Sequence, residues 1–259
     1  MKTALKELGF KPLISDESTY YNVQFSIFIV TYVDDFLIFG PSIEEINRLK
    51  EKITEIFDIK DLGPIHYFLG IQILRDRPNR TIKINQSTYI QQIIDISCLT
   101  DIKTSPIPLS PGLLKNIDYK SFSKVKAERK LIKEYQQLIG RLMYVMTHTR
   151  PDICFTVGFL ARFMQNPNQQ LLNAAKGVFK YLKGIKDYSI VYNGSERPEL
   201  LGYSDSDYGG DYETRKSTFG YLFSLNNGPI SWKSKRQLTI ALSTTEAEFN
   251  GLEQATRES

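Results

Sequence analysis

Two adjacent aspartates, Asp34 and Asp35, lie between two runs of apolar, β-branched and aromatic residues. The stretch from Val23 to Gly40, VQFSIFIVTYVDDFLIFG, is typical of two buried strands joined by a hairpin with both acids at its tip. Neighbouring carboxylates repel each other and lose hydration beside an apolar sheet, so a positive charge must compensate them or one must take up a proton. A divalent cation such as Mg²⁺ meets this need, because it binds one or two carboxylates and leaves its other positions to water and substrate phosphates. The alternative is an ordinary turn, in which aspartate is common.

A second group of acids lies near the C-terminal end of the sequence. Asp205 and Asp207 follow an apolar run that predicts a strand, and Glu246 and Glu248 fall in the first turns of a predicted helix. An aspartate on a strand and a glutamate on a helix that follows several strands can meet at one metal ion. The alternative is simpler, since acidic residues in a first turn suit any helix.

Charge is distributed unevenly along the 259 residues, although the net charge is only +4. Residues 101–190 contain 15 lysines and arginines against six acidic residues, and both flanking segments are slightly acidic. A basic segment beside clustered carboxylates favours a nucleic-acid backbone held next to metal-binding acids. A set of solvated helix faces explains the same excess of charge.

Composition narrows the class of protein. With 41% hydrophobic and 12% aromatic residues, the chain is expected to fold around sizeable cores. The apolar stretch Val23–Phe39 has the length of a membrane span, but two central aspartates make insertion unfavourable, and we expect no membrane partner. The N-terminus has no secretory signal pattern, and the two cysteines and two histidines fit neither a disulfide framework nor a zinc site. A reducing intracellular compartment is expected.

The periodicity of apolar residues predicts an α+β fold. In the first part, Gly9 ends a helix, Ser42 and Glu45 form a capping box, an interior Gly70 weakens a strand, and Ser87 caps a short helix. The elements expected there are a helix over Lys2–Leu8, the hairpin, a helix after Ser42, strands over Ile65–Leu74 and Thr81–Asn85, and a helix after Ser87.

The second part of the sequence begins with a proline-rich segment, Thr104–Leu114, that predicts a linker. Three helices and then four strands are expected after it, at Ala127–Thr147, Asp152–Met164, Gln169–Lys183, Ser189–Asn193, Leu200–Ser204, Phe219–Leu225 and Ile230–Lys233. A helix over Ala241–Ala255, with Ser243 or Thr244 as its N-cap, completes the set.

Several collinear motifs together resemble the polymerase and ribonuclease H regions of copia-type retrotransposon reverse transcriptases. The resemblance covers essentially the whole chain. Its motifs are Tyr32-Val33-Asp34-Asp35, Asp61-Leu62-Gly63, Tyr67-Phe68-Leu69-Gly70-Ile71, the segment Tyr135–Tyr144, Thr149-Arg150-Pro151-Asp152-Ile153, Tyr181-Leu182-Lys183-Gly184, Tyr203–Asp207, Arg215-Lys216-Ser217-Thr218, Gly228–Trp232 and Ala241–Glu248.

The resemblance implies an RNA-directed DNA polymerase that uses two Mg²⁺ or Mn²⁺ ions for nucleotidyl transfer. It makes Asp34 and Asp35 metal ligands of the polymerase site, and Asp205 and Glu248 metal ligands of the ribonuclease H site. Asp207 and Glu246 remain alternatives to Asp205 and Glu248, because a shift of two residues in the motif match exchanges one acid for the other in each case. Nucleic-acid contacts are expected from Tyr32, Gly70, Arg141, Arg150, Lys176, Lys180 and Lys183.

Three functional segments follow from the resemblance. Residues 1–103 are expected to form a partial palm with the hairpin and primer-positioning strands, 104–187 a linker and basic helical thumb or connection, and 188–259 the first part of a ribonuclease H-like domain. The partners implied are an RNA template, a DNA primer, the RNA–DNA hybrid and deoxynucleotide triphosphates. The expected location is the cytoplasm, in a virus-like particle, or the nucleus.

Two hypotheses about activity remain open. Fingers, an earlier palm strand with another metal-binding aspartate, and the later ribonuclease H elements have no counterpart in this sequence, so both sites are expected to be incomplete. In the first hypothesis, neighbouring polyprotein segments or a partner chain complete them. In the second, the chain is an inactive remnant of a degraded element that binds nucleic acid without sequence preference.

Overall fold

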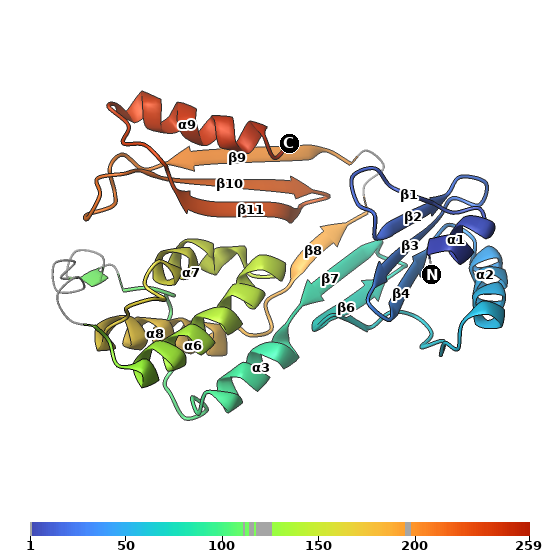
Figure 1. Cartoon of the computed structure of the whole chain (residues 1–259), viewed down its shortest axis with the longest axis horizontal. Helices are drawn as coiled ribbons and strands as arrows, with labels where there is room; N and C mark the ends of the chain where they lie inside the picture. The colour runs from blue at the N-terminus through green and yellow to red at the C-terminus, as the bar shows by residue number, and fades with distance from the viewer. Residues whose placement is uncertain (1, 111, 114–116, 118–125, 195–197) are drawn as a thin grey trace. The chain divides into compact units, whose positions relative to one another are not determined.

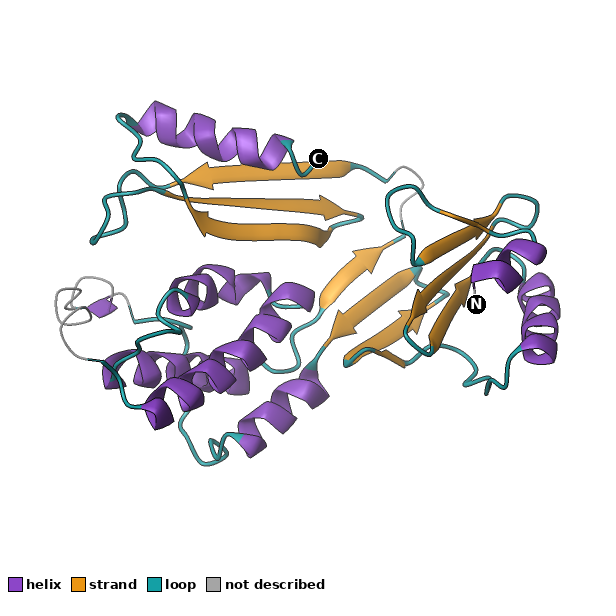
Figure 2. Ribbon diagram, viewed as in Figure 1, coloured by secondary structure: helices purple, strands orange, loops and turns teal. Residues whose placement is uncertain are grey.

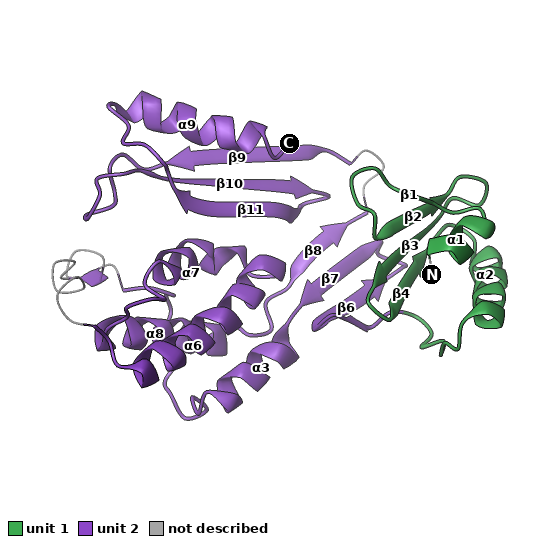
Figure 3. Ribbon diagram, in the orientation of Figure 1, with its two compact units in different colours: residues 1–64 green, residues 65–259 purple. Residues whose placement is uncertain are grey.

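The computed structural model describes residues 2–110, 112–113, 117, 126–194 and 198–259. The chain divides into two compact units, residues 1–64 and 65–259 (Figure 3). Residues 111, 114–116 and 118–125 lie outside the described part, and the predicted linker falls partly among them. Within the described residues, no helix has the length and apolar character needed to cross a lipid bilayer.

The first unit is one antiparallel sheet covered on one face by helices (Figure 1). Its buried core, which includes Tyr20, Ile27 and Ile29, joins this face of the sheet to both helices. In chain order, the elements are α1 (Lys2–Glu7), β1 (Lys11–Pro12), β2 (Thr19–Asn22), β3 (Ile27–Tyr32), β4 (Asp35–Phe39) and α2 (Ile43–Ile56).

The ends of these helices follow the sequence signals. Gly9 has a φ of +82°, in the left-handed region that a helix C-terminus commonly uses. The Ser42 hydroxyl accepts a hydrogen bond from the Glu45 backbone N–H at 3.2 Å, which confirms it as the N-cap of α2. The Ser42 hydroxyl also donates to the Glu44 carboxylate at 2.8 Å, while the Glu45 carboxylate accepts from Arg48 at 2.6 Å, so among the described contacts only the Ser42 half of the capping box is formed.

The second unit contains two sheets and a group of helices. One antiparallel sheet has the strand order β5-β6-β7-β8, and the other has the order β11-β10-β9. The strands are β5 (Tyr67–Phe68), β6 (Ile71–Asp76), β7 (Thr81–Asn85), β8 (Ile190–Asn193), β9 (Leu200–Ser206), β10 (Thr218–Leu225) and β11 (Gly228–Arg236).

The second unit includes a group of helices, drawn in purple in Figure 2. Their buried side chains make the largest core of the molecule's described part. The members of the group are α3 (Ser87–Ile96), α6 (Arg129–His148), the 3₁₀ turn η1 (Pro151–Ile153), α7 (Cys154–Ala161) and α8 (Gln169–Gly184). Helix α9 (Thr244–Thr256) packs on β9 and β10 instead, and the Ser243 hydroxyl caps it by accepting from the Glu246 N–H.

Two predictions about these elements were wrong. The strand expected over Ile65–Leu74 is a short hairpin, β5 and β6, with Leu69 and Gly70 as its turn. Ser87 does not cap α3, because it is the first helical residue and donates its hydroxyl hydrogen bond to Gln72. The strand expected at Ser189–Asn193 is confirmed as β8, Ile190–Asn193, and the structure shows that it pairs with β7, far earlier in the chain.

Candidate functional site

The hairpin of the first unit holds Asp34 and Asp35. Tyr32 pairs with Asp35 across β3 and β4, so the two-residue turn consists of Val33 and Asp34, and Asp35 is the first residue of β4. Val33 has a φ of +53°, a conformation that a β-branched residue rarely adopts. A strained backbone therefore lies directly before the two acids, as is common where a turn presents functional side chains.

The alternation of side chains along the strands places Asp35 on the face of the sheet opposite α1 and α2. Ile27 and Ile29 face the helices, whereas Phe28 and Val30 face the other way, together with Tyr32 and its cross-strand partner Asp35. On this open face, Phe28 stacks against Tyr21 and Phe39, with ring centroids 4.3 and 5.3 Å apart. The open face thus combines an aromatic surface with one carboxylate.

Both carboxylates at the hairpin are exposed to solvent, and so is Tyr32, whose exposed fraction is 55%. Among the described residues, neither acid has a hydrogen-bond or ion-pair partner, so their oxygens are available to an external cation. Two such carboxylates fit the ligand needs of Mg²⁺, which keeps several positions for water and substrate. No group of three or more possible metal ligands occurs within the described ranges.

The C-terminal acids separate into two classes by their contacts. Asp207 accepts hydrogen bonds from the backbone N–H groups of Gly210 and Thr218, at 3.0 and 2.9 Å, and so shapes the loop after β9. Glu246 accepts from the Leu242 N–H at 2.8 Å at the start of α9. Asp205 and Glu248 are exposed and have no such partner in the part of the chain that the structure describes. The two pairs therefore differ in whether their carboxylates already accept a described hydrogen bond.

Asp205 and Glu248 lie on adjacent elements, but the structure does not place them on one side of the sheet. The Ser204 and Ser206 hydroxyls point at Gly251 of α9, since a Cβ added to this glycine would lie 3.5 and 2.2 Å from them. Alternation along β9 therefore turns Asp205 to the face away from α9. A metal shared by Asp205 and Glu248 stays a prediction.

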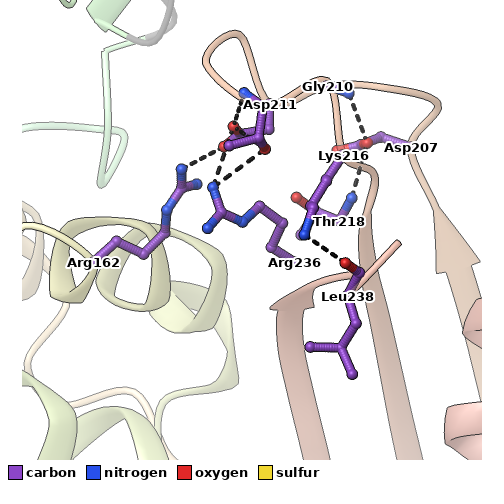
Figure 4. A network of polar contacts seen from close by, with 9 residues as sticks. Arg162, Asp207, Gly210, Asp211, Lys216, Thr218, Arg236 and Leu238 are labelled. Atoms are coloured by element: carbon purple, nitrogen blue, oxygen red, sulfur yellow. Dashed lines mark hydrogen bonds and ion pairs between the residues drawn. The ribbon is translucent and has the colours of Figure 1, made fainter. Parts of the chain in front are cut away.

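A buried carboxylate that sequence reasoning missed, Asp211, lies in the loop between β9 and β10 (Figure 4). Asp211 is 5% exposed and forms ion pairs with Arg162, at 2.5 Å, and with Arg236, at 3.3 Å. Its Oδ1 also accepts hydrogen bonds from the Thr214 N–H and hydroxyl, at 2.8 and 2.7 Å. Burial alone would raise the pKa of Asp211, but the Thr214 hydrogen bonds and the Arg162 charge outweigh it and hold the pKa below its usual value.

This carboxylate connects the helices to the C-terminal sheet. Arg162 follows α7, and Arg236 is the last residue of β11. At the same contact, Trp232 of β11 donates its indole hydrogen bond to the Met146 carbonyl of α6 at 2.9 Å. Asp211 could not be recognised from the spacing of residues in the sequence, because its partners Arg162 and Arg236 come from distant segments.

The predicted nucleic-acid residues on the helices differ in how accessible they are. Lys180 is exposed, whereas the ammonium of Lys176 pairs with Glu134 at 2.8 Å. The ammonium of Lys183 donates to the carbonyls of Thr100 and Ile102, at 2.5 and 2.9 Å, and so fastens α8 to the chain that follows α3. Lys180 is therefore the predicted lysine that is free to meet a phosphate without breaking a described contact.

Two predicted arginines have structural contacts. Arg150 is 2% exposed; its guanidinium binds Asp152 through two hydrogen bonds, at 2.9 and 2.6 Å, and donates a third to the Ile185 carbonyl at 3.1 Å. Burial alone would raise the pKa of Asp152, but Arg150 and Tyr181 outweigh it and lower the pKa. Arg141 donates to the Ser97 hydroxyl at 2.8 Å. Because its side chain is buried and already paired, Arg150 is not available for contact with nucleic acid.

Gly70 lies in the turn between β5 and β6 and contacts a tyrosine side chain instead of a second backbone. Its φ is +75°, and a Cβ added to it would lie 3.1 Å from the Tyr144 hydroxyl oxygen. The Tyr144 hydroxyl donates a hydrogen bond to the carbonyl of Leu69. Sequence reasoning assigned a role to this glycine but not to Tyr144, 74 residues later.

The comparisons with known proteins agree with this arrangement of motifs. A family model described as reverse transcriptase (RNA-dependent DNA polymerase) matches residues 1–111. This match places the first 111 residues in a reverse transcriptase family, and no solved structure matches the chain.

The curated relatives define the family more narrowly. The Retrovirus-related Pol polyprotein from transposon TNT 1-94 of Nicotiana tabacum is 38% identical over 95% of this chain and 19% of its own length. The corresponding polyprotein from transposon RE1 of Arabidopsis thaliana is 30% identical over 97% of this chain and 17% of its own length. An uncharacterized mitochondrial protein of Arabidopsis thaliana is 32% identical over 87% of this chain and 90% of its own length. The chain belongs to the copia-type retrotransposon reverse transcriptase family, and it spans less than a fifth of these two polyproteins.

Proposed function

We propose that this chain supplies the metal-binding hairpin, the primer-positioning hairpin and part of the duplex-binding surface of an RNA-directed DNA polymerase in retrotransposition. The observation that carries the proposal is the pair of exposed carboxylates, Asp34 and Asp35, on a strained hairpin within the matched reverse transcriptase region. The family membership makes a template–primer duplex and deoxynucleotide triphosphates the substrates to test.

In this proposal, the two carboxylates provide oxygens for divalent cations, Mg²⁺ or Mn²⁺, next to an open aromatic face. When bound, such ions activate the primer 3′-hydroxyl and neutralise charge on the triphosphate. Tyr32, beside the acids on this face, is exposed and able to contact a nucleotide. The β5–β6 hairpin positions the primer end, and Lys180 contributes a sequence-independent phosphate contact.

For the C-terminal sheet, we propose the first part of a ribonuclease H that acts on RNA–DNA hybrids, with Asp205 and Glu248 as ligands. Asp207 and Glu246 already accept backbone hydrogen bonds, so their loss is expected to affect folding of the loop and the helix first. This difference in contacts supports the assignment of Asp205 and Glu248.

The experiment is primer extension by the longer Pol reading frame that contains this chain. Asp34→Asn and Asp35→Asn are expected to lower the extension rate by about 10²-fold or more, because charge placed at the metals supplies much of the catalysis. Glu55→Gln, a change of an exposed acid on α2 in the same unit, is the matched control and is expected to extend at the normal rate. Normal extension by both hairpin variants would refute the role of the two aspartates.

A second candidate function is sequence-independent nucleic-acid binding without catalysis. The observation that favours it is the excess of basic over acidic residues in residues 101–190, where Lys180 is exposed on α8. The isolated chain is then expected to bind duplex with an affinity that falls steeply as salt rises, and to show no extension with Mg²⁺. Binding that does not change with salt would contradict this alternative.

A further inference from the structure

The turn between β5 and β6 has a conformation that its sequence alone does not favour. Phe68 pairs with Ile71, which leaves Leu69 and Gly70 as a two-residue turn. Their φ angles are +47° and +75°, and positive φ at both central residues is the pattern of a type I′ turn. Glycine adopts such angles freely, but leucine rarely does. Contacts from elsewhere must therefore hold Leu69 in the left-handed region.

The contact that meets this need comes from α6. The Tyr144 hydroxyl donates to the carbonyl oxygen of Leu69, the residue with the unfavourable φ. The ring of Tyr144 also packs on Gly70, where an added Cβ would lie 3.1 Å from the hydroxyl oxygen and 3.4 Å from Cε1. One side chain thus contacts both central residues of the turn.

Tyr144 is itself held in place on two sides. Its ring meets Tyr89 of α3 edge-on, with centroids 5.0 Å apart, and lies 4.3 Å from the ring of His148, one turn along α6. The Nδ1 atom of His148 lies 2.8 Å from the Tyr144 carbonyl oxygen. A tyrosine restrained in this way can transmit the position of the helix to the turn.

We propose that Tyr144 is a positioning residue that latches the Leu69–Gly70 turn to α6, so that the turn presents a fixed surface to the 3′ end of the primer. The assignment of this turn to the primer end rests on the proposed function; the latch itself rests on the contacts alone. With this latch, the position of the primer terminus depends on the Tyr144 hydroxyl of α6, which lies outside the β5–β6 hairpin.

The test uses Tyr144→Phe in the full chain, because this change removes the hydroxyl and keeps the ring. Tyr135→Phe is the matched control: it lies on the same helix, and its hydroxyl also donates to a backbone carbonyl, that of Leu160, at 2.7 Å. The first readout is hydrogen–deuterium exchange of the peptide that spans residues 67–72. Loss of one hydrogen bond is expected to speed its exchange about fivefold in Tyr144→Phe, while Tyr135→Phe leaves it unchanged relative to the β7 peptide.

The second readout places 2-aminopurine either at the primer 3′ terminus or inside the duplex. Tyr144→Phe is expected to change the fluorescence of the terminal probe in the bound complex and not that of the internal probe, with duplex affinity within about twofold of normal, because phosphate contacts set the affinity. A general loss of structure would affect both probes, so the difference between them isolates positioning.

The outcomes separate the latch from the proposed function. Unchanged exchange of the 67–72 peptide in Tyr144→Phe would overturn the latch whether or not the chain binds nucleic acid. Faster exchange with an unaltered terminal probe would overturn the positioning role. A normal chain that does not bind the duplex would count against the proposed function, while the exchange result would still decide whether Tyr144 holds the turn.

Discussion

Replacement of Asp211 by asparagine is expected to destabilise the contact between the helices and the C-terminal sheet by about 3 kcal/mol, the lower end of the cost of breaking a buried ion pair. The lower end applies because the side chains of Arg162 and Arg236 keep 22% and 32% of their exposure, so water partly solvates them once the carboxylate is gone. The asparagine keeps one acceptor oxygen but replaces the other with an NH₂ donor that faces an arginine donor, so hydrogen bonds are lost as well as the charge.

Urea unfolding monitored by tryptophan fluorescence measures this effect directly. Trp232 is the single tryptophan of the chain, and its indole binds the Met146 carbonyl in the same contact. Its emission therefore reports separation of β11 from α6. Glu213→Gln, an exposed acid two residues along the same loop, is the matched control and is expected to leave the midpoint unchanged.

The pH dependence of this difference provides a second test. Because the pKa of Asp211 is lowered in the folded state, its stabilisation is fully present above the ordinary pKa of an unfolded aspartate, about 3.9, and is lost as the pH falls through the folded-state value. The gap in midpoint between the normal chain and Asp211→Asn is thus expected to be full at pH 7 and to narrow below about pH 4. Equal midpoints at pH 7, or a gap that stays constant into acid, would refute the ion-pair reasoning.

Two further changes test other features of the structure. Arg150→Lys is expected to lower the free energy of unfolding by about 2–3 kcal/mol, because a lysine cannot reproduce the two hydrogen bonds to Asp152 and the third to Ile185. Thermal unfolding at the same temperature as the normal chain would show that these three hydrogen bonds do not contribute to stability. Val33→Asn is expected to leave the first unit as stable as before or to stabilise it by up to about 1 kcal/mol, since asparagine tolerates the positive φ better than a β-branched residue. A clear loss of stability in chemical denaturation would mean that Val33 is not strained.

Local patterns were sufficient for most of the elements. The helix expected over Gln169–Lys183 is α8, Gln169–Gly184, because its apolar residues recur at helical spacing and form the buried face. The strand expected over Thr81–Asn85 coincides with β7, and Ser243 is the N-cap of α9. In α2 the isoleucines and leucine at helical spacing are not all buried, because Ile43 and Ile56 at its ends are 55% and 46% exposed while Leu49 and Ile53 are buried.

The candidate site was predictable to the extent that it is local. Asp34 and Asp35 are neighbours in the sequence, and the apolar, β-branched and aromatic composition of the flanking runs was enough to place a hairpin there. The expected loss of hydration was wrong, because both acids are exposed to solvent. The choice of Asp205 and Glu248 over Asp207 and Glu246 gained support only from the backbone hydrogen bonds of the second pair.

By itself, the sequence determined the family, the acids of the hairpin and the helices with strong periodicity, since each depends on residues within a few positions of one another. Only the tertiary structure decided that Leu69 and Gly70 form a turn, because the leucine adopts its unfavourable φ against Tyr144, 75 residues away. It alone also made Asp211 a buried link between Arg162 and Arg236, and turned Arg150 from a candidate phosphate ligand into a structural residue. The physical reason is the same in each case: conformation and charge state at these positions depend on partners that packing, and not chain neighbourhood, brings into contact.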